Sequence, residues 1–139
     1  MNLKKIAFDT DNDANLGLLI LRIFIGAAMF THGLAKLQGG VAGFTQNVAN
    51  MGIPAAQLLG PLAVFAESAG AILLAIGLLT RPAAFLLVCT MAVAVFKVHG
   101  GQGFSAQETA WLYLVPSLFF LLKGAGKWSV DALLSKKAG

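Results

Sequence analysis

The chain has 139 residues, of which 58% are hydrophobic and only 12% are charged. This composition excludes an ordinary soluble domain and is typical of integral membrane proteins, with room for one compact bundle and no second domain. The net charge of +4 suits contact with acidic lipid head groups rather than nucleic acid, and the single cysteine, Cys89, excludes an internal disulfide and the CxxC motifs of redox, zinc and c-type haem sites.

Four apolar segments are candidates for membrane-spanning helices, each of which needs about 20 residues to cross the bilayer core. They lie at residues 16–37, 58–79, 82–98 and 108–122. We predict a polar N-terminal tail at residues 1–15, a four-helix transmembrane domain at residues 16–133 and a basic C-terminal tail at residues 134–139. The fold class that follows is all-α: an integral membrane four-helix bundle.

The only long connection, residues 38–57, carries a short amphipathic pattern. Its apolar residues recur three or four positions apart, at Val41, Phe44, Val48 and Met51. Such a stripe predicts a short interfacial helix that lies on the membrane surface in the first outer loop and ends near Gly52 and Pro54.

The positively charged residues near the span ends predict the orientation of the chain. Seven of them fall on the side that holds both termini and the turn at residues 80–82, namely Lys4, Lys5, Arg81, Lys123, Lys127, Lys136 and Lys137. The opposite side has only Lys36 and Lys97 at its span ends. By the positive-inside rule, we expect a multi-pass protein of the cytoplasmic (inner) membrane with both termini in the cytoplasm.

Two charged residues fall well inside the predicted spans, away from the span ends: Arg22 in the first and Glu67 in the second. Ala63, Ala71 and Ala75 share the fourfold spacing of Glu67 and form a small-residue ridge, which predicts close approach to another helix. If each residue adds 1.5 Å along a helix that crosses a core of about 30 Å, the depths of the Arg22 and Glu67 Cα atoms in the membrane differ by only about 7 Å. We expect a buried ion pair that holds the two helices in register or, as the alternative, a proton- or substrate-binding site.

A second polar group gathers at the outer ends of the spans. It consists of His32, Lys36, Lys97, His99 and Glu108. These side chains could bind an anion, hydrogen-bond a quinone head group or move protons, because histidine titrates near neutral pH. The structural alternative is that the lysines extend to water and the histidines anchor helix ends. The spacing of the histidines matches no metal-ligand motif, so no metal site is predicted.

A series of short motifs runs through residues 16–133. In order they are Leu21-Arg22, His32-Gly33-Leu34-Ala35-Lys36-Leu37, Gly52-Ile53-Pro54, Glu67-Ser68-Ala69-Gly70, Gly77-Leu78-Leu79-Thr80-Arg81, the residues His99, Phe104 and Glu108, and Gly124-Ala125-Gly126-Lys127-Trp128-Ser129-Val130-Asp131. Their order and spacing resemble the DoxX family of small four-helix membrane proteins. One departure is Ser68-Ala69-Gly70, where the family often has a Gly-Gly pair, and it affects packing more than chemistry.

The resemblance implies a function linked to membrane redox chemistry, because the family is named for a subunit associated with quinone-linked oxidation of sulfur compounds. We expect a quinone-interacting or accessory subunit of a membrane redox system, with a bound quinone or lipid as its ligand. The alternatives are a non-enzymatic binding or transport module for a small lipophilic or anionic solute, and a membrane anchor for a partner enzyme. The expected partners are the lipid bilayer and a redox protein, and not nucleic acid. Homo-oligomers and an enzymatic activity of the chain itself stay open.

Overall fold

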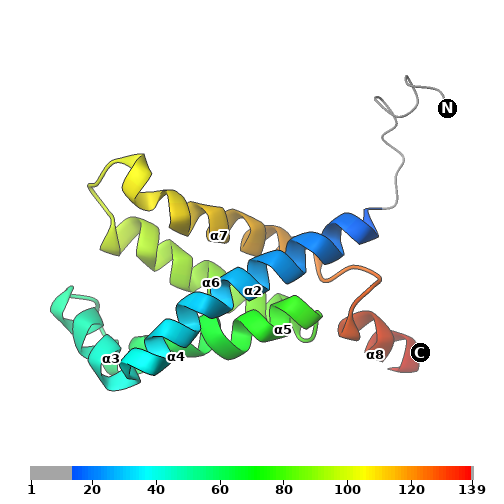
Figure 1. Cartoon of the computed structure of the whole chain (residues 1–139), viewed down its shortest axis with the longest axis horizontal. Coiled ribbons are helices and arrows are strands. Elements are labelled where there is room, and N and C mark those ends of the chain that lie inside the picture. The colour runs from blue at the N-terminus through cyan, green and yellow to red at the C-terminus, as the bar shows by residue number, and fades with distance from the viewer. Residues whose placement is uncertain (1–13, 139) are drawn as a thin grey trace.

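The computed structural model describes residues 14–138, and within that range the chain is built from helices without any strand (Figure 1). The α-helices are α2 (Asn15–Gly39), α3 (Val41–Asn50), α4 (Ala56–Phe65), α5 (Ala71–Ile76), α6 (Thr80–Val93), α7 (Phe104–Lys123) and α8 (Val130–Ala138). Two π-helical turns, η1 (Ala66–Gly70) and η2 (Ala94–Val98), join α4 to α5 and extend α6. The predicted polar tail lies outside the described residues except for its last two positions.

Three continuous helical segments are long and apolar enough to cross a membrane, at Asn15–Gly39, Ala56–Ile76 and Thr80–Val98. Helix α7 packs along α6 as a fourth long helix but begins with the polar residues Ser105, Gln107 and Glu108. In Figure 1, α3 lies at one end of the bundle and α8 at the other. The all-α membrane fold predicted from the sequence is confirmed. The short helix predicted between the first two spans is present as α3, and α8 occupies most of the predicted basic tail.

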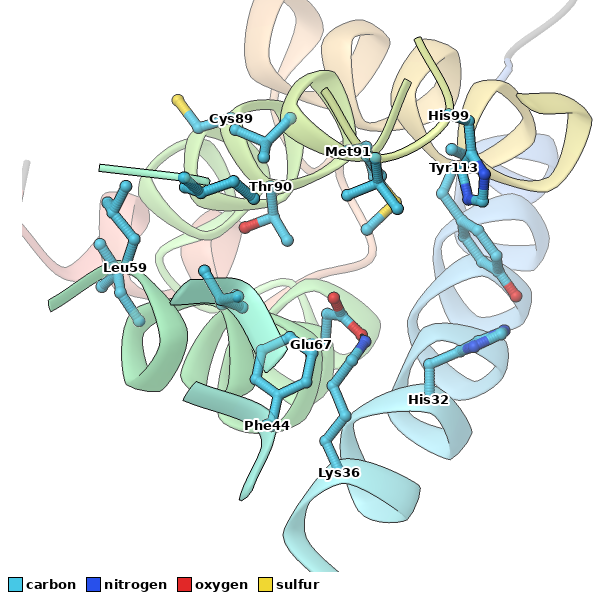
Figure 2. Close-up of a pocket in the computed structure, with 18 of the residues that line it drawn as sticks. His32, Lys36, Phe44, Leu59, Glu67, Cys89, Thr90, Met91, His99 and Tyr113 are labelled. Carbon is cyan, nitrogen blue, oxygen red and sulfur yellow. The ribbon is translucent and has the colours of Figure 1, made fainter. Parts of the chain in front are cut away.

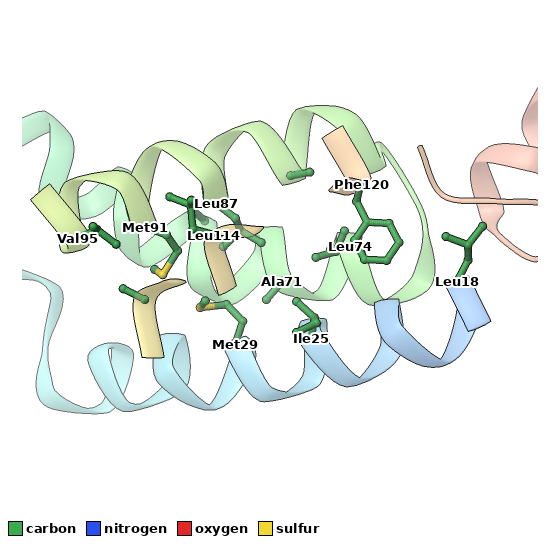
Figure 3. Close-up of a cluster of buried hydrophobic side chains, with 13 residues drawn as sticks. Leu18, Ile25, Met29, Ala71, Leu74, Leu87, Met91, Val95, Leu114 and Phe120 are labelled. Carbon is green, nitrogen blue, oxygen red and sulfur yellow. The ribbon is translucent and has the colours of Figure 1, made fainter. Parts of the chain in front are cut away.

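The core of the bundle is a continuous cluster of apolar side chains drawn from all four long segments (Figure 3). Met29, Leu74, Leu87 and Phe120 are fully buried within it. Large apolar side chains also cover the outside of the bundle, where Phe24 is 68% exposed. An apolar exterior of this extent is what a bilayer-facing surface requires, since a soluble monomer rarely exposes such a patch.

Glycines in α2 bring this helix close to the segment that contains Glu67. A Cβ on Gly26 would lie 2.7 Å from the Ala71 carbonyl oxygen, and one on Gly33 would overlap the backbone of Glu67. Small residues permit such close approach of two helices in a membrane. These two contacts therefore fix the register of α2 against η1 and α5, and the predicted packing of the alanine ridge against a neighbouring helix is confirmed at Ala71.

This register makes the predicted ion pair between Arg22 and Glu67 wrong. Glu67 lies level with Gly33, which is eleven residues beyond Arg22, or about 16 Å at 1.5 Å per residue. The sequence estimate placed the ends of the two spans at equal depth, whereas the glycine contacts shift one helix along the other. An arginine side chain cannot span the difference, so each charge has another partner.

Arg22 binds the C-terminal segment of the chain instead. It is 2% exposed, and its guanidinium donates hydrogen bonds to the carbonyl oxygens of Ala75 (3.2 Å), Ala125 and Trp128 (2.8 Å). The Ala75 oxygen belongs to the last turn of α5, where a positive charge is also favoured by the helix dipole. Gly77 follows with φ +72°, and a Cβ there would lie 2.5 Å from Ser129 and 3.0 Å from Arg22. The motif at residues 124–131 is thus structural, because its carbonyl oxygens and Ser129 hold Arg22 of α2 against the end of α5.

Asp131 completes this arrangement at the start of α6. Its two carboxylate oxygens accept hydrogen bonds from the backbone N–H groups of Leu79 (2.8 Å) and Thr80 (2.9 Å), as a helix-capping carboxylate does. Burial raises the pKa of Asp131, but the hydrogen bonds from Thr80 and Leu79 and the charge of Arg22 outweigh burial and hold the pKa below its usual range. The carboxylate therefore stabilises the fold in its ionised form.

Candidate functional site

A cavity of about 400 Å³ lies near the α3 end of the bundle (Figure 2). Ligand sites in proteins typically measure about 300–1,000 Å³ and are mainly apolar with a few polar groups. The walls follow this pattern, with apolar side chains from α2, α3, α4, α6 and α7. The polar residues among them are His32, Lys36, Glu67, Thr90, His99, Thr109 and Tyr113. The size and the lining are those of a site for a small, largely apolar molecule.

Lys36 and Glu67 form an ion pair at the cavity wall, between the Nζ of the lysine and one oxygen of the carboxylate. The side chain of Glu67 is only 4% exposed, while that of Lys36 is 25% exposed. The Lys36 ammonium also lies 5.1 Å from the centre of the Phe44 ring, which is a favourable cation–π distance. Because an ammonium has three donors and Glu67 accepts from one of them, Lys36 keeps hydrogen-bonding capacity for a ligand.

The π-helical turn η1 carries Glu67 into the cavity. A π-helix bonds to the fifth residue along, so it widens the backbone and turns the following side chains to a different face. Ser68 in the same turn donates its hydroxyl to the Val64 carbonyl at 2.5 Å, so this buried hydroxyl is satisfied within the helix. The second turn, η2, lies directly before His99, whose backbone N–H bonds to the Ala94 carbonyl at 3.0 Å. Such turns are frequent at functional sites, and here two of them border one cavity.

Three rings lie together on one side of the cavity. His32 meets Tyr113 edge to face, with 5.5 Å between ring centres and 79° between planes. Figure 2 shows His99 beyond Tyr113, on the same side. His99 is held by its loop, because its Nδ1 lies 3.4 Å from Gln102 Oε1 and its carbonyl accepts from Gln107 at 3.1 Å. The structure thus brings His32, Lys36 and His99 of the predicted cluster to a single cavity.

Lys97 and Glu108 do not join this cavity, contrary to the predicted cluster. Both side chains are exposed and neither contributes to the lining. The inward residues of α7 are Ala106, Thr109, Ala110 and Tyr113, which share one helical face. Glu108 falls off that face, and Lys97 lies on the outer side of η2. The carboxylate of the site is therefore Glu67 and not Glu108.

Sequence reasoning missed two aromatic residues of the site, Phe44 and Tyr113. Phe44 lies on the predicted apolar stripe, of which Val48 and Met51 also line the cavity. Tyr113 lies seven residues after Ala106 and four after Thr109, so the three residues share one face of the helix. The small and polar residues on that face indicate that it points into the bundle.

Comparison with known proteins places these residues in a family context. A family model described as DoxX matches residues 17–100, the part of the chain that holds His32, Lys36, Glu67 and His99. An uncharacterised protein of Haemophilus influenzae is 35% identical over 127 residues, covering 86% of this chain and 92% of the relative. The "Inner membrane protein YqjF" of Escherichia coli is 30% identical, covering 88% of this chain and 95% of the relative. The "Putative oxidoreductase CatD" of Bacillus subtilis is also 30% identical, covering 87% and 89%. No solved structure matches the chain significantly.

Proposed function

This chain belongs to the DoxX family of membrane proteins, and we propose that it is the subunit of a membrane redox system that binds a quinone head group in the cavity between α2, α3 and α7. The name of the B. subtilis relative, which describes it as an oxidoreductase, supports a redox role. The membrane location is shared with the E. coli relative, whose name assigns it to the inner membrane.

One observation carries the proposal: a partly exposed ammonium is fixed at the wall of a mainly apolar cavity. Lys36 is held by Glu67 and by the Phe44 ring, so its position is set before any ligand arrives. A quinone has two carbonyl oxygens that accept hydrogen bonds and a flat apolar ring. Lys36 suits one carbonyl, and the imidazole N–H groups of His32 or His99 and the hydroxyl of Tyr113 suit the other. The apolar walls suit the ring.

The same residues could also supply the protons that a quinone takes up when it is reduced. Reduction of a quinone to a quinol takes up two electrons and two protons. The cavity has two histidines, whose ring nitrogens can donate or accept a hydrogen bond, and His32 is exposed at its rim. The electrons come from a partner redox protein, because the sequence carries no haem-attachment, flavin, nicotinamide or iron–sulfur motif. The role proposed for this chain is therefore to bind and orient the quinone.

The test is binding of decylubiquinone to the protein purified in mild detergent. We expect the double variant His32→Ala/His99→Ala to bind at least ten times more weakly than the unmodified chain. The matched control is Lys97→Ala/Glu108→Ala, which removes two exposed polar residues from the same end of the bundle but outside the cavity, and we expect it to bind normally. The proposal fails if the unmodified chain does not bind the quinone or if the two double variants lose affinity equally.

A further inference from the structure

The cavity has two chemically different ends. At one end lie Lys36, His32 and Tyr113. Helices α4 and α6 contribute apolar side chains to the lining, namely Leu59, Leu62, Ala63, Leu86, Cys89 and Val93. Figure 2 shows Leu59 and Cys89 on the side opposite His32 and Tyr113. Thr90 adds little polarity there, because its hydroxyl donates to the Leu86 carbonyl at 2.8 Å. The cavity is thus polar at one end and apolar at the other.

On α4 and α6, residues that line the cavity also reach the outside of the bundle. Leu62 and Cys89 line the cavity and are also exposed on the surface, Leu62 at 38%. The exterior of these two helices carries large apolar side chains such as Leu58 and Phe85, which are 67% and 53% exposed. Both helices belong to candidate membrane spans. We expect an opening between two such apolar surfaces to face hydrocarbon and not water.

We propose that this opening is a lateral portal through which the apolar tail of the ligand extends into the bilayer. The inference rests on the proposed function for the identity of the head group and adds the class of quinone that the site takes: one that carries a hydrocarbon tail. Such a ligand enters from the membrane, with its ring at Lys36 and its tail between Leu62 and Cys89. Helix α3 covers the cavity through Phe44 and Val48, and the exposed lining residues Leu62 and Cys89 put the exit for a chain too long for about 400 Å³ between α4 and α6.

The portal is tested by narrowing it and comparing two probes. Leu62→Trp places a large side chain on one lip, and Cys89→Trp does the same on the other. Leu58→Trp is the matched control, one turn earlier on α4, exposed, and outside the cavity lining. Binding of decylubiquinone and of the tail-free dimethoxymethylbenzoquinone is measured for each protein in lipid nanodiscs.

We expect each lip variant to weaken binding of decylubiquinone at least tenfold while leaving binding of the tail-free quinone within about twofold, and Leu58→Trp to change neither. Unchanged binding of both probes by both lip variants overturns the portal, and so does an equal loss for the two probes. In those cases the proposed function survives, because the unmodified chain still binds a quinone. If the unmodified chain binds neither probe, the proposed function itself fails.

Discussion

Replacement of Lys36 by methionine is the most informative single change, because it leaves the carboxylate of Glu67 without its cation. Glu67 is 4% exposed, so its carboxylate depends on the ammonium for most of its charge compensation. Removing one member of a buried pair costs about 3–5 kcal/mol, mainly from the charge left behind. Methionine keeps an unbranched apolar stem of similar length, so apolar packing is largely retained while the cation–π contact with Phe44 is lost. For a domain of this size, about 1 kcal/mol shifts Tm by about 3 °C, which predicts a fall of about 10–15 °C.

The measurement is thermal unfolding in mild detergent, arranged as a double-mutant cycle. The double variant Lys36→Met/Glu67→Leu removes both charges, and we expect it to be more stable than Lys36→Met alone. The matched control is Lys97→Met, an exposed lysine at the same end of the bundle, with a change of about 0.5 kcal/mol or less. If Lys36→Met leaves Tm unchanged, or if the losses of the two single variants simply add, then the ion pair does not stabilise the fold in the way the burial of Glu67 implies.

Three further predictions concern the rest of the fold. The depressed pKa of Asp131 means that its carboxylate contributes stability above the unfolded pKa of about 4 and loses it as the pH falls through the lower folded value. Asp131→Asn should therefore lower Tm at pH 7 but much less at pH 3, and equal effects at both would contradict the capping role. Gly33→Ala should cost about 1–3 kcal/mol because its Cβ meets the backbone of Glu67, whereas Gly17→Ala, with open space around it, should be neutral or stabilising in the same melting assay. A cysteine at Gln46 in a Cys89→Ser background should react with an impermeant maleimide in intact cells; labelling only after permeabilisation would reverse the predicted orientation.

The helices follow from the sequence because their signal is local. A run of apolar residues between turn residues such as Gly52 and Pro54 is enough to place a span within a few positions. The positions where helices touch are not local. Gly26 and Gly33 shift α2 along its neighbour, and nothing within either segment shows by how much. For that reason the sequence predicts a pair between Arg22 and Glu67, whereas in the structure Arg22 donates its hydrogen bonds to the C-terminal segment.

The candidate site was predictable only in part. His32 and Lys36 are one helical turn apart, so their shared face can be derived from the sequence. The π-helical turns η1 and η2 cannot, because no residue pattern in AESAG or AVFKV distinguishes them from regular helix. These turns decide that Glu67 and His99 enter the cavity and that Lys97 does not. The prediction placed Glu108 with the polar residues at the outer span ends because of its depth in the membrane alone. It did not consider on which face of α7 this residue lies.

The central claim is that a quinone ring occupies the cavity beside Lys36, and an experimentally determined structure of the protein in nanodiscs with decylubiquinone tests it most directly. The account predicts density for the ring between Lys36, His32 and Tyr113, with the tail leaving between α4 and α6. Density for the quinone only on the outer surface of the bundle, with the cavity free of it, would contradict the account.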